Sequence, residues 1–210
     1  MPSEVWLYHL TPVANLPRIL ASGGLWCKSE LAHQRQAHQS IAFDHIQDRR
    51  ALCPVPCGPG GVLPEYVPFY FCPRSPMLFV LHKGGVPGFT GNQRSLAHLA
   101  LRLEAVAAES LPFVFTDGHA AMSLTSFFSD RGSLDRVDWK VIEETSWANT
   151  PSDPDRKRRK QAELLVHRFV PWRLVERVGV YDSDAARQSR ELLAGDPPGP
   201  DVQIRPHWYY

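Results

Sequence analysis

The sequence predicts an α+β fold in which short strands are joined by helices and long turns. Runs rich in β-branched and aromatic residues recur along the chain, as at residues 66–71, and such runs are typical of short strands. Leu16, Ile19 and Leu20 give another segment the single apolar face of a short helix. The 14 glycines and 19 prolines indicate many turns around a modest regular core. With 210 residues and no evident linker, we expect one domain over residues 1–210.

Composition and charge narrow the class of protein. Apolar residues make up 43% of the chain and charged residues 21%, as in soluble globular proteins. The formal net charge is only +1, so any contact with nucleic acid must come from local clusters of cations. The sequence has no recognisable secretory signal and no run of roughly 20 apolar residues that could span a bilayer. We therefore expect a cytoplasmic protein that does not associate with a membrane.

The first half of the chain is predicted to begin with a strand at residues 5–9. Thr11 as N-cap and Pro12 in the first turn then start a helix, which Gly23 and Gly24 end. The polar residues 29–50 predict an ordered loop that runs into a helix ending near Arg50. Beyond it, we predict an irregular Pro/Gly-rich segment at 54–64, buried strands at 66–71 and 77–81, a loop at 84–91, and a strand or helix at 98–106.

The second half of the chain alternates between the two kinds of element. The apolar runs predict strands at 113–115, 162–170 and 177–181, and an edge strand at 202–204. Helices are predicted at 118–128 and 183–193, with a short amphipathic piece at 137–142.

A metal site and a phosphate-binding glycine loop both find little support. Zinc modules usually need two close pairs of ligands, and of Cys27, Cys53, Cys57 and Cys72 only the middle two form a close pair. Unpaired thiols are the better interpretation, so we expect no metal. Residues 58–61 are rich in glycine, but no Gly-Lys-Ser/Thr follows them. A surface turn explains them.

Glu163 is a lone carboxylate at the start of an apolar strand, where an unpaired buried charge would be costly. By itself this pattern favours a solvent-facing position at a sheet edge. Five consecutive cations at 156–160 precede it, and together they could form a positive rim for a substrate that carries phosphates. The run taken alone slightly favours a solvated loop.

Two other polar groups follow predicted strands. His9 and Thr11 offer a ring nitrogen and a hydroxyl to a bound ribose or amide, although a core histidine and an N-cap would explain them equally well. Asp117 is a natural N-cap, and Gly118 permits close approach of the backbone. Local structure does not explain a histidine at position 119, whose ring could instead form a hydrogen bond to a ligand.

Several blocks in a fixed order resemble one family over nearly the whole chain. They are His9-x-Thr11 with Asn15-Leu16-Pro17 and Ile19, Arg50, the block Glu65 to Phe71 (Glu-Tyr-Val-Pro-Phe-Tyr-Phe), Ser75-Pro76-Met77-Leu78, Phe113-x-Phe115-Thr116-Asp117-x-His119-Ala120, and Gln161-Ala162-Glu163. Each block is weak alone, but their order is specific. The chain resembles the DarT family, the toxin half of DarT–DarG toxin–antitoxin systems.

The resemblance implies an ADP-ribosyltransferase-like fold: a split, mostly antiparallel β core with surrounding helices. It implies transfer of ADP-ribose from NAD to N3 of thymine, within a short sequence motif of single-stranded DNA. NAD is then a substrate, no metal is needed, and a DarG-like macrodomain antitoxin that removes the modification is the expected partner. The alternatives are the same NAD chemistry on RNA, a protein or a small molecule, and a silent module that binds NAD or nucleic acid without turnover.

The resemblance also assigns roles to residues. Glu163 and Arg50 are expected to be catalytic, although the neighbouring Arg49 leaves the register ambiguous by one position. The residues expected to bind NAD are His9, Leu10, Thr11, Arg50, Tyr70 and Gln161, and the segment 34–50 is expected to close over it. The residues expected to contact DNA are Phe43, Arg74, His119, Trp147, Arg156 and Arg158, with residues 117–160 as the substrate-recognising stretch.

The chemistry explains why such residues are needed. Cleavage of the bond to nicotinamide passes through an oxocarbenium-like state, which an ionised Glu163 beside the ribose 2′-hydroxyl can stabilise. The five cations at 156–160 are expected to keep this carboxylate charged. Thymine must lose its imide proton, and Arg50 is suited to stabilise the resulting anion because a guanidinium is a strong, permanently charged donor. On this basis Arg50→Ala should remove transfer and leave NAD binding mostly intact.

Overall fold

A mixed, mostly antiparallel sheet forms the centre of the protein, which is described from a computed structural model covering residues 2–34, 39, 41, 44–85, 89, 91–195 and 199–210. Within this part of the chain, eight strands run in the order β10 (Asp201–Ile204), β9 (Arg177–Val180), β4 (Leu96–Arg102), β1 (Trp6–Pro12), β3 (Tyr66–Tyr70), β7 (Glu163–His167), β5 (Phe113–Thr116) and β6 (Phe127–Phe128). Only β9 and β10 pair in parallel. A two-stranded ribbon joins β2 (Gly24–Trp26) to β8 (Phe169–Pro171). The predicted α+β class is confirmed.

The sheet is split in the middle, between β1 and β3. Strand β1 pairs with β4 at seven positions, but with β3 only at Tyr8↔Tyr70. Strand β3 then pairs with β7 at five positions, the last of which is Tyr70↔Glu163. Directly opposed residues share one face of a sheet, so Tyr8, Tyr70 and Glu163 form a row across three strands. Beyond this row β1 and β3 diverge.

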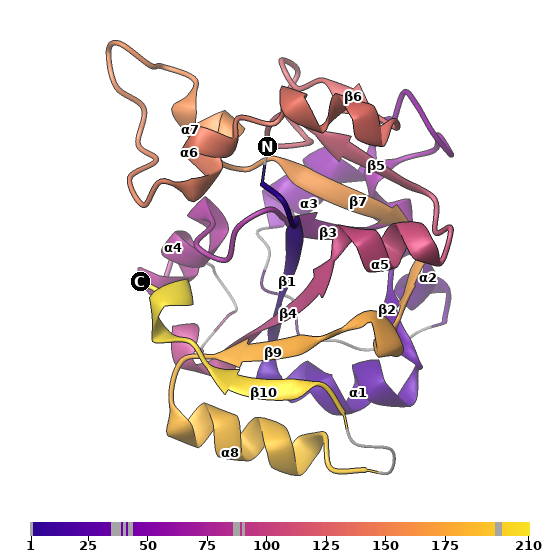
Figure 1. Cartoon of the computed structure of the whole chain (residues 1–210), viewed down its shortest axis with the longest axis vertical. Coiled ribbons are helices and arrows are strands. Elements are labelled where there is room, and N and C mark those ends of the chain that lie inside the picture. Colours follow the sequence, from indigo (N-terminus) through magenta and orange to yellow (C-terminus); the bar gives the residue numbers. More distant parts are fainter. Residues whose placement is uncertain are drawn as a thin grey trace.

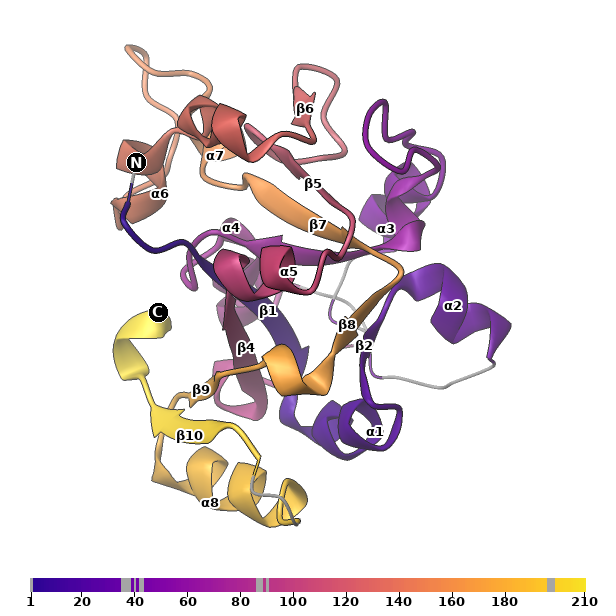
Figure 2. The same ribbon diagram turned by 45° about the vertical axis from the view of Figure 1, so that its right-hand side comes forward.

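Short helices surround the sheet (Figures 1 and 2). Helix α8 (Ser183–Leu192) packs along β10 at one end of the molecule, next to α1 (Leu16–Ala21). At the other end, α6 (Trp139–Glu143) and α7 (Arg156–Arg159) lie together near the start of the chain. The remaining helices are α2 (Lys28–His33), α3 (Asp44–Ala51), α4 (Pro76–His82) and α5 (Leu103–Ala108).

The hydrophobic core lies on both faces of the central strands. In β7, Leu164 and Val166 belong to one buried cluster and Leu165 to another, and all three are fully buried. Strand β4 is buried at six of its seven positions. These continuous apolar runs are typical of strands that are covered on both sides. Glu163 is therefore followed in β7 by three fully buried apolar residues.

Three predicted elements are wrong. Residues 77–81 form helix α4 rather than a strand, because Ser75 caps the Leu78 N–H at 3.2 Å and Pro76 occupies the first turn. Residues 118–128 form turns and β6 rather than a helix, since Asp117 accepts from the Ser126 N–H at 2.9 Å, across the loop, instead of capping a helix. Thr11 lies inside β1, and the first α-helix begins only at Leu16.

Most other elements are confirmed, with small changes. Strands are found near 5–9, 66–71, 113–115, 177–181 and 202–204, and helices near 183–193 and within 137–142. The apolar run at 98–106 is the end of β4 followed by α5. The predicted strand at 162–170 is two strands, β7 and β8, because Arg168 adopts a positive φ of 62° between them.

His98 lies in β4 and is only 1% exposed. Its ring packs against Tyr8, Trp208 and Tyr209, with centroids 5.1 to 6.2 Å away. Neither ring nitrogen has a hydrogen-bond partner among the residues that the structure describes. Desolvation by burial, helped by nearby His9, lowers the pKa of His98 from 6.5 to about 3.

This depressed pKa makes the folding stability sensitive to acid. The unfolded chain takes up a proton at His98 below pH 6.5 and the folded chain does not, so stability is lost as the pH falls towards 3. We expect His98→Phe to reduce the loss of unfolding free energy between pH 7 and pH 5 by about 2 kcal/mol. Urea unfolding of both proteins at the two pH values measures it. Equal losses in the two proteins would contradict the prediction.

Candidate active site

A cavity of about 530 Å³ opens where β1 and β3 diverge. Residues of β1, α1 to α3, β3, α4 and β7 line it, together with the turn after β5. Its lining includes most of the predicted site residues: His9, Leu10, Thr11, Arg50, Tyr70, His119, Gln161 and Glu163. It also includes residues that the sequence did not single out as ligand contacts, among them Asn15, Trp26, Lys28, Met77, Met122 and Lys157.

Glu163 is the first residue of β7, and only 2% of it is exposed. The Arg50 Nη1 atom lies 3.0 Å from each of its two carboxylate oxygens. The Ala120 N–H donates to Glu163 Oε1, also at 3.0 Å. The solvent-facing position that the strand pattern alone favoured is therefore wrong, because this charge is buried with a cation and a backbone donor.

Burial of Glu163 by itself would raise the pKa of its carboxyl. Arg50, His119 and the Ala120 N–H outweigh this effect, so the pKa lies below its usual value and the group is ionised at neutral pH. Glu163 in turn raises the pKa of Arg50 despite its burial.

The five cations at 156–160 do not produce this charged state, so that prediction is wrong. Arg158 and Arg159 each form ion pairs with aspartates on their own side of the molecule. The buried Lys160 donates to two backbone carbonyls, those of Ile142 and Glu144, both at 2.6 Å. The positive charges of Arg158, Arg159 and Lys160 are thus compensated by groups other than Glu163.

The backbone of Glu163 is fixed by Thr116, at the end of β5. The Glu163 N–H donates to Thr116 Oγ1 at 3.0 Å, and this buried hydroxyl donates onward to the Gly118 carbonyl at 2.7 Å. The sequence drew attention to the block 116–120, but not to these roles. A backbone amide such as that of Ala120 has no residue-type signal, so only the folded loop shows its contact.

Arg50 comes from the last turn of α3, directly after Arg49, and it is Arg50 that pairs with Glu163. Arg49 also lines the cavity, but among the described contacts Arg50 is the arginine that meets Glu163. The two partners are 113 positions apart in the sequence. Breaking such a buried pair leaves one charge without compensation.

The residues predicted to bind NAD lie along the wall of the cavity. His9 Nδ1 donates to the Pro68 carbonyl at 2.9 Å, so Nε2 is left as an acceptor; burial lowers the pKa of His9, which favours this neutral form. Thr11 Oγ1 accepts from the Asn15 amide at 3.2 Å. Burial raises the pKa of Tyr70, whose hydroxyl remains protonated.

Gln161 lines the same cavity two residues before Glu163. Its amide nitrogen donates to the Lys157 carbonyl at 3.0 Å, which leaves the amide oxygen as an acceptor. Leu10 belongs to the apolar cluster beside α4 and closes the wall on that side.

The residues predicted to contact DNA are scattered. His119 lines the cavity; its Nδ1 accepts from the Ala121 N–H at 3.2 Å, so the neutral ring carries its proton on Nε2, and burial lowers its pKa. Arg74 lies 4.6 Å over the ring of Tyr210, and Trp147 donates to the Tyr210 hydroxyl at 2.7 Å. These two side chains are outside the cavity lining. Phe43 lies outside the described residues.

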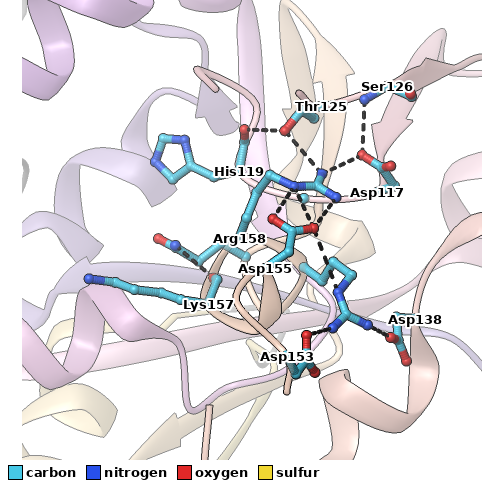
Figure 3. A network of polar contacts seen from close by, with 12 residues as sticks. Asp117, His119, Thr125, Ser126, Asp138, Asp153, Asp155, Lys157 and Arg158 are labelled. Atoms are coloured by element: carbon cyan, nitrogen blue, oxygen red, sulfur yellow. Dashed lines mark hydrogen bonds and ion pairs between the residues drawn. The ribbon is translucent and has the colours of Figure 1, made fainter. Parts of the chain in front are cut away.

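Arg156 and Arg158 are held by partners within the protein. Arg156 forms an ion pair with Glu144 and donates to the Ser146 carbonyl. Arg158 is 8% exposed and lies at the centre of the polar network in Figure 3. In the folded chain the three nitrogens of its guanidinium all donate to carboxylates and a hydroxyl, so a DNA contact of Arg158 stays a prediction that these contacts disfavour.

The described part of the chain shows neither a metal-binding cluster nor a membrane-spanning helix. Within it, no three His, Cys, Asp or Glu side chains come together in a way that could hold a metal ion. No helix found there has the length and apolar character required to cross a bilayer.

A split antiparallel sheet with an ionised glutamate at the end of a central strand, facing a cavity, defines the class as an ADP-ribosyltransferase. The family model for the ssDNA thymidine ADP-ribosyltransferase DarT matches residues 8–210. The chain belongs to this family.

Relatives and solved structures agree with this assignment. The chain is 42% identical over 211 residues to the DNA ADP-ribosyl transferase of Thermus aquaticus, covering 100% of this chain and 90% of that protein. The DNA ADP-ribosyl transferase of Escherichia coli O127:H6 is 33% identical, and the match covers 100% of this chain and 95% of that protein. The structure of Thermus sp. 2.9 DarT with ADP-ribosylated ssDNA superposes with a TM-score of 0.91 at 39% identity, with 100% and 98% of the two chains covered. The structure of Thermus sp. 2.9 DarT with NAD+ superposes with a TM-score of 0.89 at 37% sequence identity, and the match covers 100% of this chain and 99% of that chain.

A Thermosipho africanus fusion protein, named DNA ADP-ribosyl transferase-DNA ADP-ribosyl glycohydrolase, is 26% identical over 190 residues. The match covers 89% of this chain and 45% of the fusion protein.

The Arg50–Glu163 pair supports a prediction about stability. We expect Arg50→Met to lower the unfolding free energy at pH 7 by about 3 kcal/mol, since the buried Glu163 loses its cation. Without that cation burial raises the pKa of Glu163 above the ordinary 4.5, whereas the wild-type pKa lies below it. The deficit relative to the wild type should therefore begin to shrink at a pH above 4.5, as the variant takes up its proton, and go on shrinking down to the wild-type pKa.

Urea unfolding across this pH range measures the effect, with the double variant Arg50→Met/Glu163→Gln as the control. The double variant should recover stability at pH 7. A deficit of Arg50→Met that is independent of pH and is not relieved by Glu163→Gln would refute the role assigned to the pair.

Proposed function

We propose that this protein transfers ADP-ribose from NAD to N3 of thymine, within a short sequence motif of single-stranded DNA, and releases nicotinamide. Family membership supports the reaction class. The observation that carries the proposal is the position of Glu163: it is charged, nearly dry and directed at the cavity by Arg50 and Ala120. A carboxylate in such surroundings stabilises developing positive charge far better than one in water.

NAD lies in the cavity with its nicotinamide ribose beside Glu163. Solved structures of Thermus sp. 2.9 DarT with NAD+ and with carba-NAD+ support NAD as the substrate. As the bond to nicotinamide breaks, the sugar acquires oxocarbenium character. Glu163 accepts a hydrogen bond from the ribose 2′-hydroxyl and stabilises that charge, while His9, Thr11, Tyr70 and Gln161 orient the dinucleotide. Nicotinamide is a good leaving group, so a strong general acid is unnecessary.

Arg50 contributes both to cleavage of the bond to nicotinamide and to activation of the thymine acceptor. One of its nitrogens holds both oxygens of Glu163 in place. Arg50 also lines the cavity, and in the proposed reaction its guanidinium stabilises the thymine imide anion as N3 gives up its proton to solvent. Because the two roles share one side chain, Arg50→Ala disturbs Glu163 as well as the acceptor. We therefore revise the expectation that this variant leaves NAD binding mostly intact.

A single-stranded acceptor follows from the chemistry. Thymine N3 is engaged in base pairing in a duplex, so a paired thymine cannot accept the sugar unless it leaves the stack. The Thermus sp. 2.9 complex with ADP-ribosylated ssDNA supports this substrate class. His119 faces the cavity with an Nε2–H donor, which suits a base carbonyl.

Among the cations at 156–160, Lys157 is the one suited to a DNA phosphate. It is exposed and lines the cavity, and its ammonium lies 5.9 Å from the ring of Trp147. In the described part of the chain it forms no ion pair with a carboxylate, whereas Arg156, Arg158 and Arg159 all do. Lys157 therefore replaces Arg156 and Arg158 as the phosphate contact, and Trp147 beside it offers a stacking surface for a base.

The proposal extends to the protein's biological setting. A DarG-like macrodomain antitoxin that removes ADP-ribose is the expected partner, supported by the Thermosipho africanus fusion of transferase and glycohydrolase. The protein then acts as the toxin of a toxin–antitoxin pair in the cytoplasm, where NAD and single-stranded DNA are both present.

The acceptor can be tested by incubating the protein with NAD and oligonucleotides and measuring their mass. We expect an increase of one ADP-ribose on thymine-containing single strands, and none on duplexes, on strands without thymine, or on strands whose thymines are methylated at N3. Glu163→Gln should lower the rate by about 10² to 10³, as the loss of one strong electrostatic contact does. Release of nicotinamide without any gain of mass on DNA would favour an RNA, protein or small-molecule acceptor.

The phosphate contact can be tested by salt-dependent DNA binding. We expect Lys157→Met to weaken binding of single strands of every sequence and to reduce the slope of log K against log salt by about 0.7, the value for one phosphate contact. Arg187→Met, which removes an exposed cation from α8 at the far end of the molecule, is the matched control. Equal slopes for the wild type and Lys157→Met would remove Lys157 from the DNA interface.

A further inference from the structure

Arg158 joins two segments that meet beside the cavity (Figure 3). Its guanidinium donates to both oxygens of Asp155 at 2.7 to 3.0 Å, within the segment that leads into β7. The same group donates to Asp117 at 2.8 Å and to Thr125 Oγ1 at 3.3 Å, in the turn after β5. All its donor groups thus point at fixed acceptors, and the side chain is almost fully buried.

The backbone around Arg158 holds the same turn. The His119 N–H donates to the Arg158 carbonyl at 3.0 Å, and the Thr125 hydroxyl donates to the His119 carbonyl at 2.8 Å. A Cβ atom at Gly118 would lie 2.3 Å from Arg158 Nη1, so glycine is needed for this close approach. The turn 117–126, with His119 and Ala120, is therefore fastened on both sides of these two residues.

The position of this turn matters for Glu163. Ala120 supplies the backbone donor to Glu163 Oε1, and His119 faces the same carboxylate. Arg158 itself is outside the cavity lining, and it precedes Glu163 by five residues on the same segment. In Figure 3 the His119 ring and the Lys157 side chain extend from the network to the same side, away from Arg158.

We propose that Arg158 is a positioning residue for catalysis: by clamping the turn 117–126 to the segment that carries Glu163, it sets the Ala120 N–H and the His119 ring against the catalytic carboxylate. This inference rests on the proposed NAD chemistry. It predicts a specific defect, because loss of the clamp removes a donor from Glu163 but leaves the other groups that face the carboxylate, namely Arg50, Tyr70 and Cys53.

The test measures nicotinamide release from NAD between pH 3.5 and 8.5, with a thymine-containing single strand present. The acid limb of kcat/KM reports the ionisation of Glu163 in the free enzyme, and in the wild type it lies below pH 4.5. For Arg158→Gln we expect this limb to move to higher pH and kcat/KM on the limb to fall about tenfold, the usual effect of losing one hydrogen bond to a charged group. Thr125→Val, a nearly isosteric change, should move the limb in the same direction.

Arg159→Gln is the matched control. It removes the neighbouring arginine and its ion pairs with Asp138 and Asp153, which hold a different part of the chain. It also removes a longer contact of 3.7 Å to Asp155, but it leaves the hydrogen bonds of Arg158 to Asp155 and to the turn 117–126 in place. Its acid limb should coincide with that of the wild type. If Arg158→Gln does not fold, Thr125→Val decides the question.

The outcomes separate the clamp from the proposed function. Variants at 158 and 125 that lose activity equally at all pH values, or none, would show a merely structural role and overturn the inference. A wild-type protein that releases no nicotinamide at any pH would overturn the proposed function instead.

Discussion

The charge on Glu163 is the constraint around which the structure is organised. A carboxylate that is 2% exposed and lies between the buried residues Ala162 and Leu164 is tolerated only if hydrogen-bond donors or cations compensate its charge. Here α3 delivers Arg50, the turn after β5 delivers the Ala120 N–H, and β7 delivers the carboxylate itself. Three distant segments must therefore meet for the protein to fold stably, and their meeting point is one end of the cavity. Stability and the proposed catalysis depend on the same contacts, which is common where a charged group must be kept ionised for reaction.

The split in the sheet gives this charge its access to a substrate. Strand β1 is held by β4 over its whole length, and it touches β3 at a single position, Tyr8↔Tyr70. Beyond this position residues of both strands line the cavity, while β1 stays paired with β4 and β3 stays paired with β7. Two neutral histidines flank it with opposite hydrogen-bonding character: His9 presents an acceptor nitrogen and His119 a donor. The cavity can thus distinguish donor from acceptor groups on its ligands. Cations predominate among its lining residues, where Arg18, Lys28, Arg49, Arg50 and Lys157 accompany the carboxylate of Glu163.

Comparison with the sequence shows where local patterns succeed. Strands with continuous β-branched and aromatic runs were predicted correctly, because burial on both faces of a sheet demands them. Helix α4 was mistaken for a strand because its apolar content outweighed the Ser75–Pro76 start signal. The cationic run at 156–160 was predicted to surround Glu163, but most of its members pair with aspartates and carbonyls from segments that no local pattern brings together. The residue types at 156–160 thus identified the positive charges correctly, but they did not identify the groups with which these cations pair.

The sequence by itself determined the fold class and the family and singled out Glu163, because composition, apolar runs and ordered motifs are properties of the chain. Tertiary structure alone decided which arginine meets Glu163, which backbone amide donates to it, and which cations of the run 156–160 form ion pairs within the described part of the chain. Those outcomes depend on distances of a few ångströms between residues that are far apart in the sequence. They follow from how helices, turns and strands pack around a buried charge, and a hydrogen bond leaves no trace in residue order when its donor is a main-chain N–H.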